Sequence, residues 1–245
     1  MGPFYHIGSY IYMLKALFVR PERISMYWKE TFRQMVDIGV GSLLIVAIIS
    51  FFIGAVSTVQ FAYNLQDSLI PMMYVGYVVK ESMILEFAPT ISCLILAGKV
   101  GSNISSELGS MRLSEQIDAL EIMGVHTKAY LIGPKILAAI TMIPLLVIIS
   151  AAIGIYGGMI AGILSGYVLR TDYIQGVLSF FDAFGVFVML LKSVTFGFLL
   201  TSISCYQGYN AYGGALEIGK ASTRAVVISS IMVLFADYIL AWILL

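Results

Sequence analysis

Residues Ile136 to Leu169 read ILAAITMIPLLVIISAAIGIYGGMIAGILSGYVL and contain no charged side chain. The hydrocarbon core of a bilayer is about 30 Å thick and takes roughly 20 helical residues, so this run predicts a membrane-spanning helix. At about 1.5 Å per residue, the run is longer than one perpendicular crossing requires. The helix is therefore expected either to tilt strongly or to continue beyond the bilayer.

The composition of the chain agrees with a membrane location. Of its 245 residues, 60% are hydrophobic and only 11% are charged, whereas a typical soluble domain has about 25% charged residues. Lys and Arg together number 14, as do Asp and Glu, so the chain lacks the positive charge that neutralises nucleic-acid phosphates. The composition excludes a soluble globule and argues against nucleic acid as a partner.

Four further apolar runs are long enough to cross a bilayer. Ile38 to Val59 and Ser193 to Leu216 are uncharged, Phe87 to Ser106 contains only Lys99, and Ala225 to Leu245 contains only Asp237. We therefore expect an all-α, polytopic membrane protein with five transmembrane helices. The expected spans are 38–60, 86–106, 129–165, 183–207 and 225–245.

The positions of Lys and Arg predict the orientation, because the loops on the cytoplasmic side carry the excess of both. One set of connections holds Lys15, Arg20, Arg23, Lys29, Arg33, Arg112, Lys128, Lys135, Lys220 and Arg224. The opposite loops hold only Lys80 and Arg170. The N-terminus is thus expected inside and, after five crossings, the C-terminus outside.

Two shorter segments are expected to lie at the membrane surfaces. Residues 1–37 combine aromatic side chains such as Trp28 with five basic residues, which is typical of amphipathic helices in the headgroup layer; a soluble regulatory segment is the alternative. Leu69 to Val79 is apolar but too short to cross. We expect it to form a short helix at the outer face or dipping partway into the bilayer.

Catalytic and metal-binding patterns are absent from the sequence. His6 and His126 have no ligand partners at metal-binding spacing. Gly214 to Ala221 resembles a phosphate-binding loop, but Ala221 replaces the Ser or Thr that ligates magnesium, and the segment follows a membrane span, not a strand. We therefore expect a non-catalytic chain that binds no cofactor. If ATP is used, another subunit must bind it.

A few residues inside the apolar runs are candidates for function or packing. Carboxylates in a membrane are costly and often functional, which singles out Asp237, Glu86 and Asp182; a hydrogen bond between helices, or an interfacial position, is the alternative. Small residues at every fourth position let helix backbones approach closely. Four glycines have this spacing, namely Gly154, Gly158, Gly162 and Gly166. The helix that they pack against belongs either to the same chain or to a second copy.

The longest polar interval after residue 37 is Ser105 to Gly124. Ser114 can cap a helix of about nine residues that Gly124 ends. At about 100° per residue, Glu115, Asp118 and Glu121 share one face of this helix, opposite an apolar face formed by Ile117, Ala119, Leu120 and Met123. Met111, Leu113 and Ile122 add apolar side chains beside the charges, which is typical of a docking surface. The alternative is an ordinary solvated loop.

The block Glu107-Leu-Gly-Ser-Met-Arg-Leu-Ser-Glu-Gln-Ile-Asp-Ala-Leu-Glu-Ile-Met-Gly124, preceded by Ala97-Gly-Lys-Val-Gly-Ser102, resembles the signature of MlaE-like permeases. These are the membrane subunits of MCE-associated ABC transporters that move phospholipids. Glu86-Phe-Ala-Pro89 and the segments from Cys205 to Asn210 and Thr223 to Val226 are similar to further family motifs. Lys99, Ser110 and the His126-Thr127 pair depart from the common pattern.

The resemblance implies a homodimeric permease in the bacterial inner membrane that supports outer-membrane lipid homeostasis. It implies a cytoplasmic ATPase subunit, which binds ATP and magnesium, and an MCE-domain protein on the outer, periplasmic face. A phospholipid cavity would lie between the copies, with Glu86 and Lys80 near the headgroup. The residues implied in ATPase coupling, within the segment 107–124, are Glu107, Met111, Arg112, Glu115, Asp118 and Glu121.

Two other classes of protein stay open from the residues themselves. A secondary transporter could move protons through Asp237 and Glu86, although the paired, broken spans of such transporters are not evident. A membrane scaffold without transport activity is the other class. Transport without ATP would indicate a secondary transporter, and the absence of bound lipid would indicate a scaffold.

Overall fold

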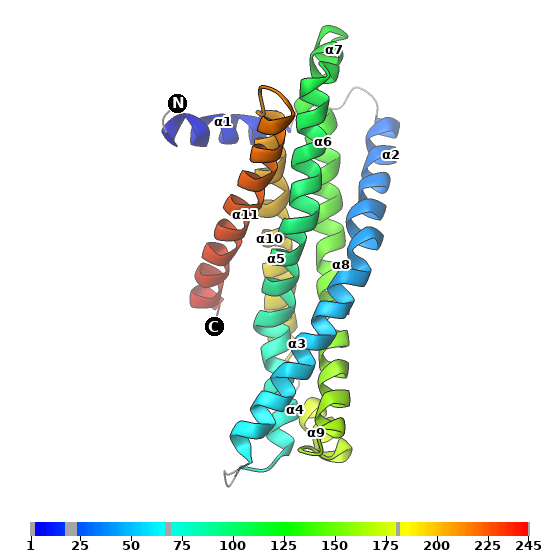
Figure 1. The fold of residues 1–245 in the computed structure, drawn as a ribbon, viewed down its shortest axis with the longest axis vertical. Helices are drawn as coiled ribbons and strands as arrows, with labels where there is room; N and C mark the ends of the chain where they lie inside the picture. The colour runs from blue at the N-terminus through cyan, green and yellow to red at the C-terminus, as the bar shows by residue number, and fades with distance from the viewer. Residues whose placement is uncertain (1–2, 18–23, 67–69, 180–181, 245) are drawn as a thin grey trace.

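The computed structural model describes residues 3–17, 24–66, 70–179 and 182–244, and these residues form helices without a strand. Within these ranges, five long apolar helices are able to cross a membrane, which confirms the all-α, five-span expectation. Successive spans run in opposite directions in one bundle (Figure 1). Their bounds are Ser25–Leu65, Met73–Leu113, Thr127–Leu164, Ala183–Tyr209 and Ala215–Leu244.

The N-terminal region differs in part from the expected interfacial segment. Helix α1 (Pro3–Ala16) lies across one end of the bundle (Figure 1), where the Tyr10 hydroxyl contacts the Ser202 hydroxyl at 2.7 Å. Helix α2 (Ile24–Met35), in contrast, stands upright and continues through the π-helix η1 (Val36–Val40) into α3 (Gly41–Leu65). No Gly or Pro between Ile24 and Ile38 ends the helix. Arg20 and Arg23 lie outside the described residues.

The second span also begins earlier than expected. Helix α4 (Met73–Ser82) continues through η2 (Met83–Ile91), α5 (Ser92–Leu96) and η3 (Ala97–Gly101) into α6 (Ser102–Leu113). The prediction of a separate short helix over 69–79 is therefore wrong from Met73 onward, while Leu69 lies outside the described residues. Pro71 precedes the helix and so breaks no bond within it. Helix α9 (Arg170–Leu178) packs on α4 at the end of the molecule that we term the α4–α9 end (Figure 1).

The third span, α8 (Thr127–Leu164), has 38 residues, which corresponds to about 57 Å. It therefore extends well beyond a bilayer, as its sequence indicates. Two of its glycines pack on α3 of the same chain. A Cβ on Gly54 would overlap the carbonyl of Gly154, and one on Gly158 would overlap the Thr58 hydroxyl. Gly162 also faces Thr58, whereas Gly166 lies beyond α8 with a φ of 72° and has no neighbour that a Cβ would meet.

The remaining spans are α10 (Ala183–Tyr209) and α11 (Ala215–Leu244). Helix α10 is central and packs on α6, α8 and α11. Helix α11 lies at one side of the bundle (Figure 1) and exposes a row of large apolar side chains. This row includes Leu234, Phe235, Tyr238, Trp242 and Ile243. Such a face is suited to lipid or to another membrane helix.

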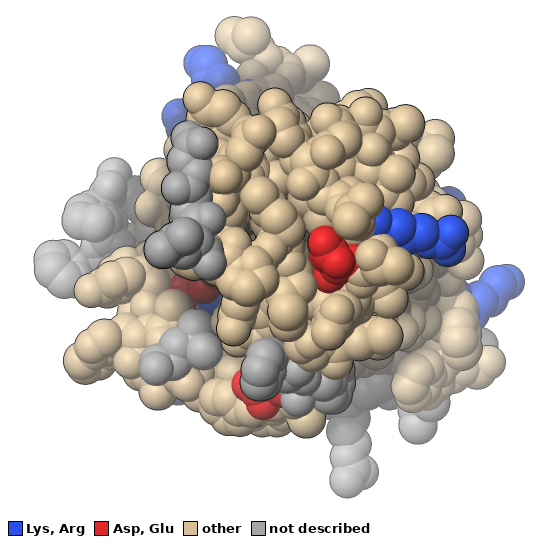
Figure 2. Space-filling model, turned by 90° about the horizontal axis from the view of Figure 1, so that it is seen from below, with Lys and Arg blue, Asp and Glu red and all other residues tan. Residues whose placement is uncertain are grey.

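The two ends of the bundle differ. Seen from the α4–α9 end, most of the surface is uncharged and only a few acidic and basic side chains appear (Figure 2). The opposite end carries α1 and the short helix α7 (Gln116–Ile122), and we term it the α7 end (Figure 1).

Candidate functional site

Three spans meet at one buried cation. Lys192, in α10, is fully buried, and its ammonium lies 2.8 Å from the Glu86 carboxylate in η2 and 2.8 Å from the Asp237 carboxylate in α11. It also donates to the carbonyl of Leu85 at 3.0 Å. Thr90 donates to the second oxygen of Asp237 at 3.1 Å. A single lysine thus joins two of the three carboxylates that the sequence singles out. We term Glu86, Lys192 and Asp237 the charge cluster.

The charge cluster is open on one side. The side chain of Glu86 is 42% exposed, whereas that of Asp237 is 15% exposed. Glu86 lies in a π-helical segment that contains Pro89, which has no N–H to donate. Such local widening of a helix is frequent at functional sites. With one positive and two negative groups, the cluster can contact a polar ligand through Glu86 while Lys192 stays enclosed.

Sequence reasoning missed Lys192. The residue directly precedes the uncharged run Ser193 to Leu216, yet it lies inside the expected span 183–207. At about 1.5 Å per residue it is roughly 14 Å from the start of α10 at Ala183. A lysine at that depth needs a partner in the protein, which is the signal that could have identified it.

Lys80 is not part of the charge cluster. It is 3% exposed, lies 3.3 Å from the Glu81 carboxylate, and donates to the carbonyl of Ser179 at 3.0 Å. Its ammonium also lies 4.9 Å from the centre of the Tyr77 ring. These contacts hold α4 near the end of α9. Asp182, the third carboxylate singled out, accepts from the Phe184 N–H at 2.9 Å and so caps α10.

The segment 107–124 forms a helix with different bounds from those expected. Helix α7 has seven residues, Gln116–Ile122, and Ser114 and Glu115 separate it from α6. Glu115 has a left-handed φ of 57°. Ser114 is not the N-cap of α7, because the Ser114 hydroxyl donates to the Ser110 carbonyl of α6 at 2.8 Å. Gly124 ends the helix with a φ of 84°, as predicted.

Arg112 links three parts of the chain at the α7 end. It donates to Asp118 of α7 at 2.6 Å and to the hydroxyl of Tyr212, before α11, at 2.8 Å. Its guanidinium also lies 5.9 Å from the centre of the Tyr209 ring, at the end of α10. Arg112 and Asp118, both candidates from the sequence, thus contact each other and connect α6, α7 and the start of α11.

Glu121 connects α7 to two further helices. Its carboxylate accepts from the hydroxyls of Tyr209 and Thr127, each at 2.9 Å. These two hydrogen bonds, the Tyr209 bond first, lower the pKa of Glu121 from its ordinary value. Glu107 pairs with Lys135 of α8 at 2.6 Å. The acidic residues of this region therefore bind the ends of the spans, with the exception of the exposed Glu115.

The buried and exposed apolar residues of the segment 107–124 differ in part from the two helix faces expected from the sequence. Ile117 is fully buried and Leu120 is partly buried, as predicted, but Ala119 and Met123 are exposed. Met111 packs against the core and is not part of the exposed set. Leu113 is 48% exposed, Ile122 88% and Met123 68%. Leu113 ends α6, whereas Ile122 ends α7 and Met123 follows it. We term these three exposed apolar side chains the α7 patch.

The segment that resembles a phosphate-binding loop does not form one. Residues Ala215 to Ala221 are the first turns of α11, and Lys220 pairs with Glu217 at 2.6 Å. Within the described ranges, no three metal-ligating side chains lie close enough to hold an ion.

Comparison with known proteins gives the family. The family model of permease MlaE matches residues 31–243. The chain belongs to the MlaE permease family. This MlaE-family permease is 35% identical over 237 residues to a probable ABC transporter permease protein of Rickettsia bellii, covering 96% of this chain and 90% of the relative.

Two further relatives of the MlaE-family permease carry more specific names. One is the intermembrane phospholipid transport system permease protein MlaE of Haemophilus influenzae, 30% identical over 96% of this chain and 90% of its own length. The other is the chloroplastic protein TRIGALACTOSYLDIACYLGLYCEROL 1 of Arabidopsis thaliana, 29% identical over 88% of this chain and 61% of the plant protein.

Proposed function

We propose that this MlaE-family permease is the membrane subunit of an ABC transporter that moves glycerophospholipids between the bacterial inner membrane and an MCE-domain protein. The name of the Haemophilus relative, a phospholipid transport permease, supports the substrate class. Five apolar spans support a multi-pass location in the inner membrane. In this proposal the chain has no catalytic activity, and ATP and magnesium are bound by a separate ATPase subunit.

The proposed orientation places the α7 end in the cytoplasm. Arg112, Lys128 and Lys220 are at or near the helix ends on this side, whereas few charges appear on the α4–α9 end (Figure 2). The N-terminus is then cytoplasmic, the C-terminus periplasmic, and the MCE-domain partner faces α4 and α9. The exposed apolar row on α11 supports a homodimer, because a second copy could cover it.

The observation that carries the proposal is the α7 patch. Leu113, Ile122 and Met123 are exposed although α7 is held to α6, α8, α10 and the start of α11 by the contacts of Arg112 and Glu121. An ATPase that binds this patch can therefore move the ends of several spans together. An apolar patch surrounded by charges is the usual composition of a protein interface.

The charge cluster is the proposed point at which these movements reach the lipid. Glu86 is the exposed member, on the second span, and Lys192 and Asp237 connect it to the fourth and fifth spans. A proton-driven secondary transporter remains the alternative for these carboxylates. The ATP-driven function is favoured by the family, and both carboxylates are already paired with Lys192.

The test is to place a charge in the α7 patch. We expect Leu113→Asp with Ile122→Asp to abolish co-purification with the ATPase subunit and ATP-dependent lipid transfer in proteoliposomes, while membrane insertion is unchanged. Leu178→Asp on α9, which is 74% exposed at the opposite end of the molecule, is the matched control for co-purification with the ATPase alone, because α9 faces the proposed MCE-domain partner. Retention of the ATPase by the double variant, or ATP-independent transfer by the purified chain, would contradict the proposal.

A further inference from the structure

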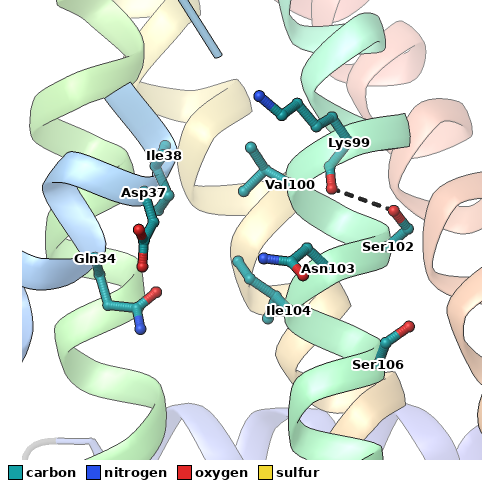
Figure 3. Close-up of a pocket in the computed structure, with 9 residues that line it drawn as sticks. All are labelled: Gln34, Asp37, Ile38, Lys99, Val100, Ser102, Asn103, Ile104 and Ser106. Carbon is teal, nitrogen blue, oxygen red and sulfur yellow. Dashed lines mark hydrogen bonds between the residues drawn. The ribbon is translucent and has the colours of Figure 1, made fainter. Parts of the chain in front are cut away.

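A groove of about 510 Å³ separates the first span from the second near the α7 end. One wall is formed by Gln34 on α2 with Asp37 and Ile38 on η1, and the other by residues of η3 and α6 (Figure 3). The two walls diverge because α2 packs on α8 while α6 packs on α10 and α11. The groove is therefore a property of the fold, since each wall is held by a different neighbour.

Each wall of the groove contains a π-helical segment. Segment η1 (Val36–Val40) lies on one side and η3 (Ala97–Gly101) on the other. The π-helix is rare and is frequently found at functional sites. A π-helical segment on each side of the same groove therefore indicates a functional site, independently of the polar residues that line the groove.

The groove has an apolar floor and charged rims. Ile38, Val100 and Ile104 are at most 5% exposed, whereas Asp37, Lys99 and Asn103 are exposed. In Figure 3, the carboxylate of Asp37 and the amide of Asn103 point into the space between the walls, while Ser102 and Ser106 point away from it. An apolar floor below polar rims fits a molecule with both an apolar and a polar part.

The two charged residues of the rim are of opposite sign and come from different spans. The Lys99 ammonium donates to the carbonyl of Gly41, which occupies one of its three N–H groups. Within the described part of the chain, the Asp37 carboxylate takes part in no hydrogen bond or ion pair. The rim therefore offers one cation and one anion to a ligand that carries both charges.

The depth of the groove suits a lipid headgroup. Its residues lie between Gln34 and Ile38 and between Lys99 and Ser106. These positions include residues 38 and 106, where the sequence places the inner ends of the first two spans. Headgroups of the inner leaflet lie at this level, and lysine side chains reach it from within the span.

We propose that this groove binds the headgroup of a zwitterionic phospholipid from the cytoplasmic leaflet, with its phosphate at Lys99 and its ammonium at Asp37. The inference rests on the proposed lipid-transport function and on its orientation. It adds a headgroup site at the α7 end, separate from the charge cluster, at which inner-leaflet lipid contacts the permease. Phosphatidylethanolamine has the required pair of charges, whereas phosphatidylglycerol lacks the ammonium.

The test uses the full chain in membranes that contain both lipids. Asn103 is replaced by photoreactive p-benzoylphenylalanine, and the adducts formed on illumination are identified by mass spectrometry. The matched control carries the same residue at Phe52, which is 61% exposed on α3 and reports the lipid composition around the protein. We expect phosphatidylethanolamine to be enriched over phosphatidylglycerol about fivefold at position 103 relative to position 52, as one ion pair implies.

Two variants connect the enrichment to the charges. Asp37→Asn should return the ratio of the two lipids to that at position 52, and Lys99→Gln should reduce adducts with both lipids about fivefold. Asp172→Asn and Lys220→Gln, which lie outside the groove, should change neither value. Melting temperatures of all four variants show whether each one is folded, so a loss of adducts with a normal melting temperature reports binding.

Other outcomes overturn the inference. Equal ratios at positions 103 and 52, or an adduct with a second copy of the chain, would show that no headgroup occupies the groove. Loss of the adducts in excess inorganic phosphate would indicate a site for free anions. ATP-dependent lipid transfer is measured on the same membranes: transfer without enrichment refutes only the groove, whereas the absence of both refutes the proposed function as well.

Discussion

Glu86 and Asp237 contact the same ammonium group, that of Lys192, at 2.8 Å each, although they lie on the second and fifth spans. Lys192 itself comes from the fourth span and is fully buried. Three helices are therefore held together by one cation, and none of the three can shift relative to the others without changing these ion pairs. The cluster therefore connects three spans through charged side chains in the interior of the bundle.

Removal of the shared cation should destabilise the protein. We expect Lys192→Met to lower the free energy of unfolding by about 3–5 kcal/mol, because it leaves the largely buried Asp237 carboxylate without a counter-charge. Thermal unfolding in detergent measures the change. Adding Asp237→Asn to Lys192→Met should recover part of the loss, and Lys220→Met, at an exposed pair, should have little effect. An unchanged melting temperature for Lys192→Met would contradict the role assigned to the cluster.

The contact between α3 and α8 should not tolerate a single added carbon. We expect Gly54→Ala to destabilise the protein by about 1–3 kcal/mol, since its methyl group would overlap the backbone of Gly154, which cannot rotate away. Gly98→Ala is the control, because a Cβ there meets no heavy atom within 4 Å. Melting temperatures of the two variants are compared; equal values would show that the helices separate easily.

Acid should weaken the attachment of α7. Since the hydrogen bonds from Tyr209 and Thr127 lower the pKa of Glu121 in the folded protein, its contribution to stability is present above the ordinary carboxyl pKa. That contribution is lost as the pH falls through the lowered pKa. We expect proteolysis near α7 to increase on acidification, and Glu121→Gln to show part of this increase already at neutral pH. A variant with the same pH profile as the wild type would show that another carboxylate is responsible.

The contacts of Arg112 should be required for coupling. Lysine keeps the charge but cannot bind Asp118 and the Tyr212 hydroxyl at once with the geometry of a guanidinium. We expect Arg112→Lys to retain the ATPase subunit and ATP hydrolysis while lipid transfer falls about tenfold, which is the effect of losing one hydrogen bond to a charged group. A proportional fall in hydrolysis and transfer would instead indicate a general loss of folded protein.

The five spans could be predicted from the sequence because an apolar run of sufficient length has few other structures available to it. The connections were less predictable. The segments 24–37 and 73–82 continue into spans, since nothing in either sequence ends the helix. The sequence suggested separate elements because the first segment is rich in basic and aromatic residues and the apolar run 69–79 is too short to cross a bilayer. The left-handed Glu115 shortened α7 and could not be foreseen, because a non-glycine residue rarely adopts this conformation.

The carboxylates of the candidate site could be predicted from the sequence, but the side chains that contact them could not. Glu86 and Asp237 are conspicuous in apolar runs, but their shared contact depends on how three spans pack, which the spacing of residues within one span does not determine. Similarly, the acidic residues of 107–124 suggested an exposed face, whereas Asp118 and Glu121 are bound by Arg112, Tyr209 and Thr127 from other helices.

The second span has a mechanical consequence of its own. From Leu113, next to α7, to Glu86 in the charge cluster, the chain is helical throughout and extends roughly 40 Å at about 1.5 Å per residue. No loop interrupts this distance, so one continuous helix, which includes the π-helical segments η2 and η3, connects the two sites. A displacement of α7 along the helix axis can therefore reach Glu86 without crossing a loop.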